Sequence, residues 1–233
     1  MLSIIIPTLN EEDYLPFLLE SIKRQNFNNY EIIVADNNSK DRTVEIAKSF
    51  GCRIAGGGLP GKGRNEGAKI AKGKVFLFLD ADNFCSSRDF LGKLIFGFKK
   101  KKLGVASFPL FLAGNNFDKF AYLIYNYWVR LTQKFLPYAT NAILVKREIF
   151  EKIRGFDEAV TMGEDHEFVR RASKVGKFGF VNTKPLLTSC RRFEADGRFK
   201  TYPKFFIANF HMLLSPKIKS DIYRYHFDKY SKK

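Results

Sequence analysis

The sequence lacks any apolar run of 18 or more residues, so we expect no helix that spans a membrane. Met1 leads directly into an apolar stretch without a basic leader, which predicts no signal peptide. Cysteine is scarce: Cys52, Cys85 and Cys190 lie far apart and match no metal-binding spacing. These absences predict a cytoplasmic protein with reduced thiols, whose contact with a membrane would be peripheral, at its inner face.

Acidic residues are few relative to basic ones, with 24 against 40, and the net charge is +16. This balance favours anionic partners, which include a nucleotide, a nucleic acid and an anionic membrane surface. A generally lysine-rich composition would produce the same charge. No recognised nucleic-acid-binding module occurs and the lysines are scattered, so we do not expect nucleic acid as the partner. Internal repeats, low-complexity segments and a P-loop are also missing.

What is present describes a folded protein: 233 residues, of which 45% are hydrophobic and 27% charged. Apolar segments at 2–7, 30–36, 52–55 and 75–79 are expected to be strands, and helical patterns separate them. This alternation predicts an α/β fold with a mostly parallel central sheet and right-handed crossovers.

Polar residues follow these strands where ligands of open α/β sheets bind. Thr8, Asp36, Asp80 and Asp82 come at or just after three of the predicted strand ends. Two carboxylates one residue apart suit a hard divalent cation that carries phosphate oxygens. The alternative is an acidic turn that opens the next helix. The glycine-rich stretch 56–63 is expected to be a flexible loop that approaches phosphates, or otherwise a surface linker.

The second half of the chain is less regular. Helices are expected at 88–102, 117–136 and 147–153, and strands at 103–112, 139–146 and 178–181. The aromatic helix 117–136 suits either a membrane interface or packing on the sheet. Glu164 and Asp165 begin a further helix, either as capping residues or as a general base facing the ligand edge. Arg191 and Arg192 suit oxyanions, and an amphipathic basic helix is expected from Thr201.

Five segments together resemble the family-2 glycosyltransferases of the GT-A fold. In chain order they are 4–12 (IIIPTLNEE), 31–39 (EIIVADNNS), 61–67 (GKGRNEG), 78–82 (FLDAD) and 163–165 (GED). The resemblance covers about residues 2–193. It implies a GT-A domain over 1–196, with a nucleotide-binding half at 1–82 and an acceptor half at 83–196, followed by a basic extension over 197–233.

The resemblance also implies roles for individual residues. The groups that bind the nucleotide of a UDP- or GDP-sugar would be Pro7, Thr8, Asn10, Glu11, Asp36, Lys62, Arg64, Asn65 and Asp80. Asp82, with Asp80, would hold Mg²⁺ or Mn²⁺ on the diphosphate. Asp165 would deprotonate the acceptor, and Glu164, Arg191 and Arg192 would contact the phosphates or the acceptor. The implied reaction is inverting transfer of one sugar to a lipid-linked or cell-envelope glycan.

Two departures from the family pattern limit this inference. The family commonly has Asp-Asp-Gly-Ser after the second strand, and here Asp36 is followed by Asn-Asn-Ser, which leaves UDP or GDP open. The Gln-x-x-Arg-Trp signature and the membrane spans of processive synthases are missing. A polyprenyl-phosphate sugar synthase of the same fold stays open. A sugar-phosphate nucleotidyltransferase is a further alternative, although such enzymes usually carry a glycine-rich arginine loop after the first strand.

Overall fold

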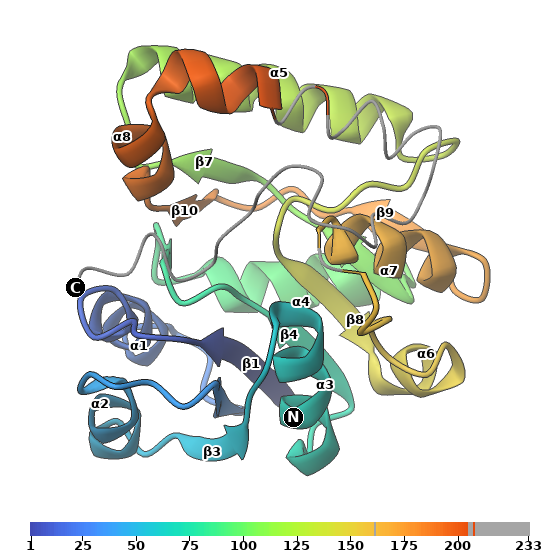
Figure 1. Cartoon of the computed structure of the whole chain (residues 1–233). Helices are drawn as coiled ribbons and strands as arrows, with labels where there is room; N and C mark the ends of the chain where they lie inside the picture. Colours follow the sequence, from blue (N-terminus) through green and yellow to red (C-terminus); the bar gives the residue numbers. More distant parts are fainter. Residues whose placement is uncertain (161, 205–206, 208–233) are drawn as a thin grey trace.

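The computed structural model describes residues 1–160, 162–204 and 207 (Figure 1). The first half alternates strands and helices: β1 (Leu2–Thr8), α1 (Leu15–Lys23), β2 (Tyr30–Asp36), α2 (Thr43–Ser49), β3 (Arg53–Gly56), α3 (Pro60–Ile70) and β4 (Val75–Phe78). The second half continues with β5 (Asn83–Cys85), α4 (Phe90–Lys100), β6 (Val105–Ser107), β7 (Leu110–Leu112), α5 (Asn116–Thr132), β8 (Ile143–Lys146), α6 (Arg147–Lys152), α7 (Glu164–Ser173), β9 (Phe178–Phe180), β10 (Leu186–Thr188) and α8 (Arg191–Asp196).

The central sheet contains seven strands in the order β3-β2-β1-β4-β8-β6-β9. The first four are mutually parallel, as predicted, whereas β8 runs antiparallel to both β4 and β6. A second sheet of three strands has the order β5-β10-β7. Because β5 begins immediately after Asp82, this small sheet starts at the carboxyl end of β4.

The central sheet is buried on both faces because alternate residues of each strand point to opposite sides. Ile4 and Ile6 of β1 pack in a cluster with residues of α1 and α4, while Ile5 packs in a second cluster with residues of α3 and α7. Helix α3 approaches β1 closely at Gly67, where an added Cβ would lie 2.5 Å from Cγ2 of Ile5. The two helical layers thus fix the strand ends from both sides.

Several predicted segments differ from the observed ones. The segment 103–112 forms two strands in different sheets, β6 and β7, because Phe108 and Pro109 interrupt it. The glycine-rich loop ends at Leu59, so Gly61, Lys62 and Gly63 belong to the first turns of α3. The turn after Asp80 leads to β5 and not to a helix. Strands β5 and β10, of three residues each, were not predicted.

No helix among the described residues is long and apolar enough to cross a membrane. Cys52, Cys85 and Cys190 are free thiols, as expected. Most of the amphipathic helix expected from Thr201 lies outside the described residues.

We predict that Gly67→Ala lowers the free energy of unfolding by about 1–3 kcal/mol, because the new methyl group would overlap Ile5. Gly92→Ala in α4 is the matched control: an added Cβ there meets nothing within 4 Å. Removing a helical glycine should stabilise the protein by about 0.5–1 kcal/mol. Urea denaturation of both variants measures the difference, and equal effects at the two positions would contradict the close approach of α3 to β1.

Candidate active site

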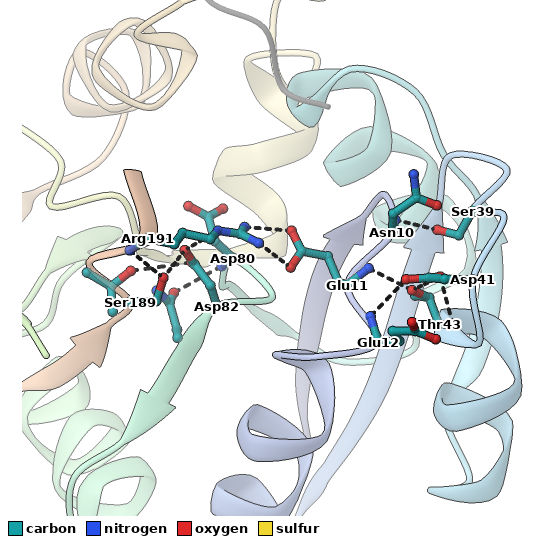
Figure 2. Close-up of polar contacts among 12 residues, drawn as sticks. Asn10, Glu11, Glu12, Ser39, Asp41, Thr43, Asp80, Asp82, Ser189 and Arg191 are labelled. Atoms are coloured by element: carbon teal, nitrogen blue, oxygen red, sulfur yellow. Dashed lines mark hydrogen bonds and ion pairs between the residues drawn. The ribbon is translucent and has the colours of Figure 1, made fainter. Parts of the chain in front are cut away.

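The candidate site lies at the carboxyl ends of β1, β2 and β4 and draws residues from both sheets (Figure 2). Asp80 and Asp82 follow β4, and Glu11 follows β1. The small sheet brings the segment after β10 to the same place, because the Ser189 amide donates to the Asp82 carbonyl at 3.1 Å. Residues separated by more than 170 positions therefore share one site.

Arg191 links Glu11 to Asp82 at this site. Its two terminal nitrogens donate to both carboxylate oxygens of Glu11, at 2.8 and 2.7 Å. Its Nε lies 3.3 Å from Oδ2 of Asp82, and its guanidinium lies over the ring of Tyr14. Figure 2 shows Arg191 between the two carboxylates. One cation thus ties the first loop to the Asp-x-Asp turn.

Arg64 is a second central cation, and its side chain is only 2% exposed. Its Nη2 donates to Oδ1 of Asp80 at 2.8 Å, and its Nη1 donates to Oε1 of Glu164 at 2.8 Å. The same Nη1 lies 2.9 Å from Oδ1 of Asp165. The resemblance implies that Arg64 binds the nucleotide. In the structure α3 already begins at Pro60, and the Arg64 side chain is buried against Asp80, Glu164 and Asp165.

The turn before α7 aims both acidic residues at Arg64. Gly163 has φ 75°, a left-handed backbone conformation that favours glycine. Glu164 and Asp165 then occupy the first turn of α7, where the helix dipole favours negative charge. The helix has no hydrogen bond from a capping side chain at Gly163. The observed contacts of Glu164 and Asp165 are with Arg64, so capping alone does not explain these residues.

Burial, and to a smaller extent repulsion between neighbouring carboxylates, raises the pKa of several acidic groups at the site. Burial raises the pKa of Glu11 to about 7, and the charges of Asp82 and Asp80 add to this against Arg191. Burial and the neighbouring Asp80 raise the pKa of Asp82. For Asp165, burial together with Glu164 and Asp80 raises the pKa despite Arg64. Three carboxyl groups share the Arg64 guanidinium, so a proton or a bound cation would balance the charge that Arg64 does not.

The donor set fits a divalent cation that is shared with a substrate. Asp80 and Asp82 offer hard oxygen ligands, and Thr188 and Ser189 place hydroxyl groups 3.3 Å from the Asp82 carboxylate. No group of three or more acidic, histidine or cysteine side chains gathers as a metal cage in the described part of the chain. Mg²⁺ is ordinarily held in this way, by one or two carboxylates together with substrate phosphates.

The first loop and the turn after β2 form a polar shelf beside these carboxylates. Asp36 accepts hydrogen bonds from the Thr8 hydroxyl at 3.0 Å and from Ser39. The Asn10 amide donates to Ser39 at 2.9 Å, and its side-chain oxygen accepts from the Lys40 amide. Asn10 has φ 52° and lies before α1, whose N-cap position is Tyr14. Strands β1 and β2 thus hold this shelf in place.

The remaining predicted site residues lie in different surroundings. Lys62 is exposed on α3, and Arg192 lies near enough to Asp82 to lower its pKa. Pro7 packs beside α3, where an added Cβ on Gly63 would lie 3.1 Å away. Asn65 is bonded to Phe156 and Glu158, away from the carboxylates.

Sequence reasoning missed three residues that contact the site: Thr188, Ser189 and Tyr14. Thr188 ends β10, a strand of three residues whose periodicity is too short to detect. The positions of Ser189 at the site and of Arg191 beside Glu11 depend on the pairing of β10 with β5. No local signal in the sequence reports that pairing.

A family model described as Glycosyl transferase family 2 matches residues 3–154, which is more than half of the chain. The chain belongs to glycosyl transferase family 2. An uncharacterized glycosyltransferase of Haemophilus influenzae is 29% identical over 209 residues, which cover 82% of this chain and 68% of that protein. The poly(ribitol-phosphate) beta-N-acetylglucosaminyltransferase TarS of Staphylococcus aureus is 35% identical over 92 residues.

Solved structures of family-2 and related transferases show the same fold. The S. aureus TarS 1–349 structure has a TM-score of 0.66 at 20% identity, and the match covers 82% of this chain and 61% of that one. A structure of PcManGT from Pyrobaculum calidifontis in complex with GDP-Man and Mn²⁺ has a TM-score of 0.64 at 19% identity, covering 81% and 56%. The expected GT-A fold is confirmed. The sequence match spans only 16% of full-length TarS.

We predict that Glu11→Gln flattens the pH dependence of stability between pH 5 and 7. A carboxyl with a folded pKa of about 7 binds more protons in the folded than in the unfolded state over this range. Its ionisation therefore removes about 2 kcal/mol of unfolding free energy as the pH rises. Chemical denaturation at several pH values measures the slope. Glu45→Gln, at an exposed ion pair with Arg42, is the control that should leave it unchanged.

We predict that Arg64→Leu lowers the free energy of unfolding by about 3–5 kcal/mol, because three carboxylates lose their common buried counter-ion. Arg42→Leu breaks a pair in which both side chains are about two-thirds exposed and should cost under about 1 kcal/mol. Urea denaturation at pH 7 compares the two. A small effect at Arg64 would show that the carboxylates are neutral or solvated in the folded protein.

Proposed function

We propose that this protein transfers a single sugar, with inversion, from a nucleoside-diphosphate sugar to an acceptor hydroxyl. Family membership and the convergence of Asp82, Asp165 and two arginines at the strand ends support this proposal. Structures of TarS with UDP-GlcNAc and of PcManGT with GDP-Man support a nucleotide-sugar donor. The names of the relatives favour a lipid-linked or cell-envelope glycan as the acceptor.

The donor would lie across the shelf made by the first loop. Thr8, Asn10 and Asp36 offer hydrogen-bonding groups for the base and ribose, and Pro7 and Glu11 flank them. Lys62 is exposed beside this shelf and is free to approach the phosphates. Asn65 is bonded to Phe156 and Glu158, so its contribution to nucleotide binding would be to hold α3 in position. The burial of Arg64 favours a positioning role, in which it holds Asp80, Glu164 and Asp165 in place.

Asp80 and Asp82 are the residues that would hold Mg²⁺ or Mn²⁺ on the diphosphate. When bound, the cation supplies positive charge to the phosphate oxygens of the leaving group. Arg191 and Arg192 add fixed positive charge on the same side, which favours departure of the nucleoside diphosphate. Glu164 would contact the acceptor or the phosphates through its place beside Arg64.

Asp165 would serve as the general base. The acceptor oxygen attacks the anomeric carbon, its proton moves to the carboxylate of Asp165, and the bond to the diphosphate breaks on the opposite side of the sugar. A raised pKa makes this carboxylate a stronger base than an exposed aspartate. Its place at the start of α7, opposite the nucleotide shelf, suits an approach from the acceptor half.

The proposal includes the organisation and location of the chain. Residues 1–82 would bind the nucleotide, residues 83–196 the acceptor, and 197–233 would form a basic extension. The enzyme would act in the cytoplasm, peripherally at the inner face of an anionic membrane. Residues 205–206 and 208–233 of this extension lie outside the described residues.

Calorimetry with UDP and GDP, with and without Mn²⁺, tests the donor site. We expect metal-dependent binding of one nucleotide, weakened at least about tenfold in Asp82→Ala because the cation loses a carboxylate ligand. Asp89→Ala removes a half-exposed carboxylate paired with Lys93 and serves as the matched control. No binding of either nucleotide to the wild-type chain would contradict the proposal.

Further outcomes separate the related reactions. Release of pyrophosphate from a sugar phosphate and a nucleoside triphosphate would identify a nucleotidyltransferase instead. A polyprenyl phosphate acceptor is already an anion and needs no general base. Turnover of the donor with polyprenyl phosphate that survives Asp165→Asn would therefore favour a polyprenyl-phosphate sugar synthase.

A further inference from the structure

Helix α5 presents an apolar stripe that stays more than half exposed in the described chain, although the ring of Phe117 meets that of Tyr202 at a centroid distance of 5.4 Å. Its exposed large side chains are Phe117, Phe120, Leu123, Ile124, Tyr127 and Leu131, each between 54% and 67% exposed. All but Leu123 follow the spacing i, i+3, i+7, i+10, i+14, which aligns them along one side of a helix. Phe135, just beyond the helix, is 90% exposed. Contiguous apolar surface of this kind marks an interaction site, whereas isolated exposed residues do not.

The opposite side of α5 already anchors the helix to the fold. The Asn126 side chain accepts from the Leu110 amide and donates to the Leu110 carbonyl, at 3.0 and 2.7 Å. The Tyr125 hydroxyl donates to Ala139, and Val129 is fully buried. These contacts confirm the packing that was one of the two expectations for this helix. The inner side of α5 therefore anchors the helix, and the exposed apolar stripe takes no part in that packing.

The exposed charged side chains on and just after α5 have one sign. Lys119, Arg130 and Lys134 are exposed. Asp118 is the sole acidic residue between 116 and 135, and it is buried in an ion pair with Arg198. Beside α5 in Figure 1, the helical residues 198–204 add exposed Phe199, Lys200 and Lys204.

We infer that the exposed face of α5 docks on an anionic lipid bilayer. Phenylalanine, tyrosine and leucine side chains enter the boundary between headgroups and acyl chains, and the flanking cations contact lipid phosphates. A second copy of the chain fits less well. A two-fold symmetric contact over this stripe would bring Lys119, Arg130 and Lys134 of both copies together.

The inner side of α5 connects to the candidate active site through the small sheet. Asn126 fastens α5 to β7, β7 pairs with β10, and β10 leads directly to Ser189 and Arg191 beside Asp82. A bilayer on α5 would therefore adjoin the acceptor half of the site. If the proposed sugar transfer holds, the acceptor is a lipid-borne group delivered from that bilayer. The docking itself does not rest on the proposed function.

Vesicle co-sedimentation of the full-length chain tests the docking surface. We expect binding to vesicles of phosphatidylcholine with phosphatidylglycerol, and much weaker binding to phosphatidylcholine alone. Phe120→Glu and Tyr127→Glu should each weaken partitioning by about tenfold, because an inserted ring is replaced by a repelled charge. Reversing Lys119, Arg130 and Lys134 to glutamate should weaken it by at least about fivefold for each residue.

Phe17→Glu in α1 and Phe96→Glu in α4 are matched controls, because their rings are 68% and 67% exposed on other helices. They should leave partitioning unchanged. Equal losses in these controls, or no loss in the α5 variants, would overturn the inference. So would binding that is lost only when Lys229, Lys232 and Lys233 are changed to glutamate. A dimer in sedimentation velocity that Phe120→Glu dissociates would assign the face to a second copy.

Nucleotide binding by the same variants keeps the two proposals distinguishable. The α5 variants should bind UDP or GDP as the wild-type chain does. If the wild-type chain binds nucleotide but does not bind vesicles, the docking surface alone is overturned. Vesicle binding without nucleotide binding overturns the proposed function alone.

Discussion

One buried guanidinium holds the two halves of the candidate site together. Arg64 comes from α3, Asp80 from the end of β4, and Glu164 with Asp165 from the start of α7. A buried charge without partners is costly, so the helix, the strand end and the turn must keep their relative positions. The geometry of the acidic site depends on this contact more than on any capping interaction. Even Gly163, which allows the tight turn, serves to aim α7 at Arg64.

The same electrostatic balance gives the site its chemistry. Two arginines with direct contacts face five carboxyl groups. Burial, together with repulsion between these groups, raises the pKa values of Glu11 and Asp82, and the cluster suits a cation shared with a phosphate ligand. Arg191 depends on the small sheet, because β10 carries the chain back to the end of β4. Without that sheet, Glu11 and Asp82 would lack their common partner.

In the second half of the chain, helix α5 packs on the fold through one side and exposes apolar residues on the other. Helix α5 uses polar contacts of Asn126 and Tyr125 to hold its inner side, and its outer stripe stays apolar. Lys119, Arg130 and Lys134 are exposed on or just after this helix, and no acidic residue is exposed there. Part of the net charge of +16 is therefore located beside the apolar stripe.

The sequence alone determined the parallel core and the edge where the site lies. The long apolar run of β1 and the carboxylates after β4 are local signals, because strand periodicity and the cost of burying charge act over few residues. Most of the candidate site residues lie within the five segments that resemble the family. The tertiary structure alone decided that Arg64 is buried and that Arg191 meets Glu11. Both depend on contacts between segments about 100 or more residues apart, which no local pattern encodes.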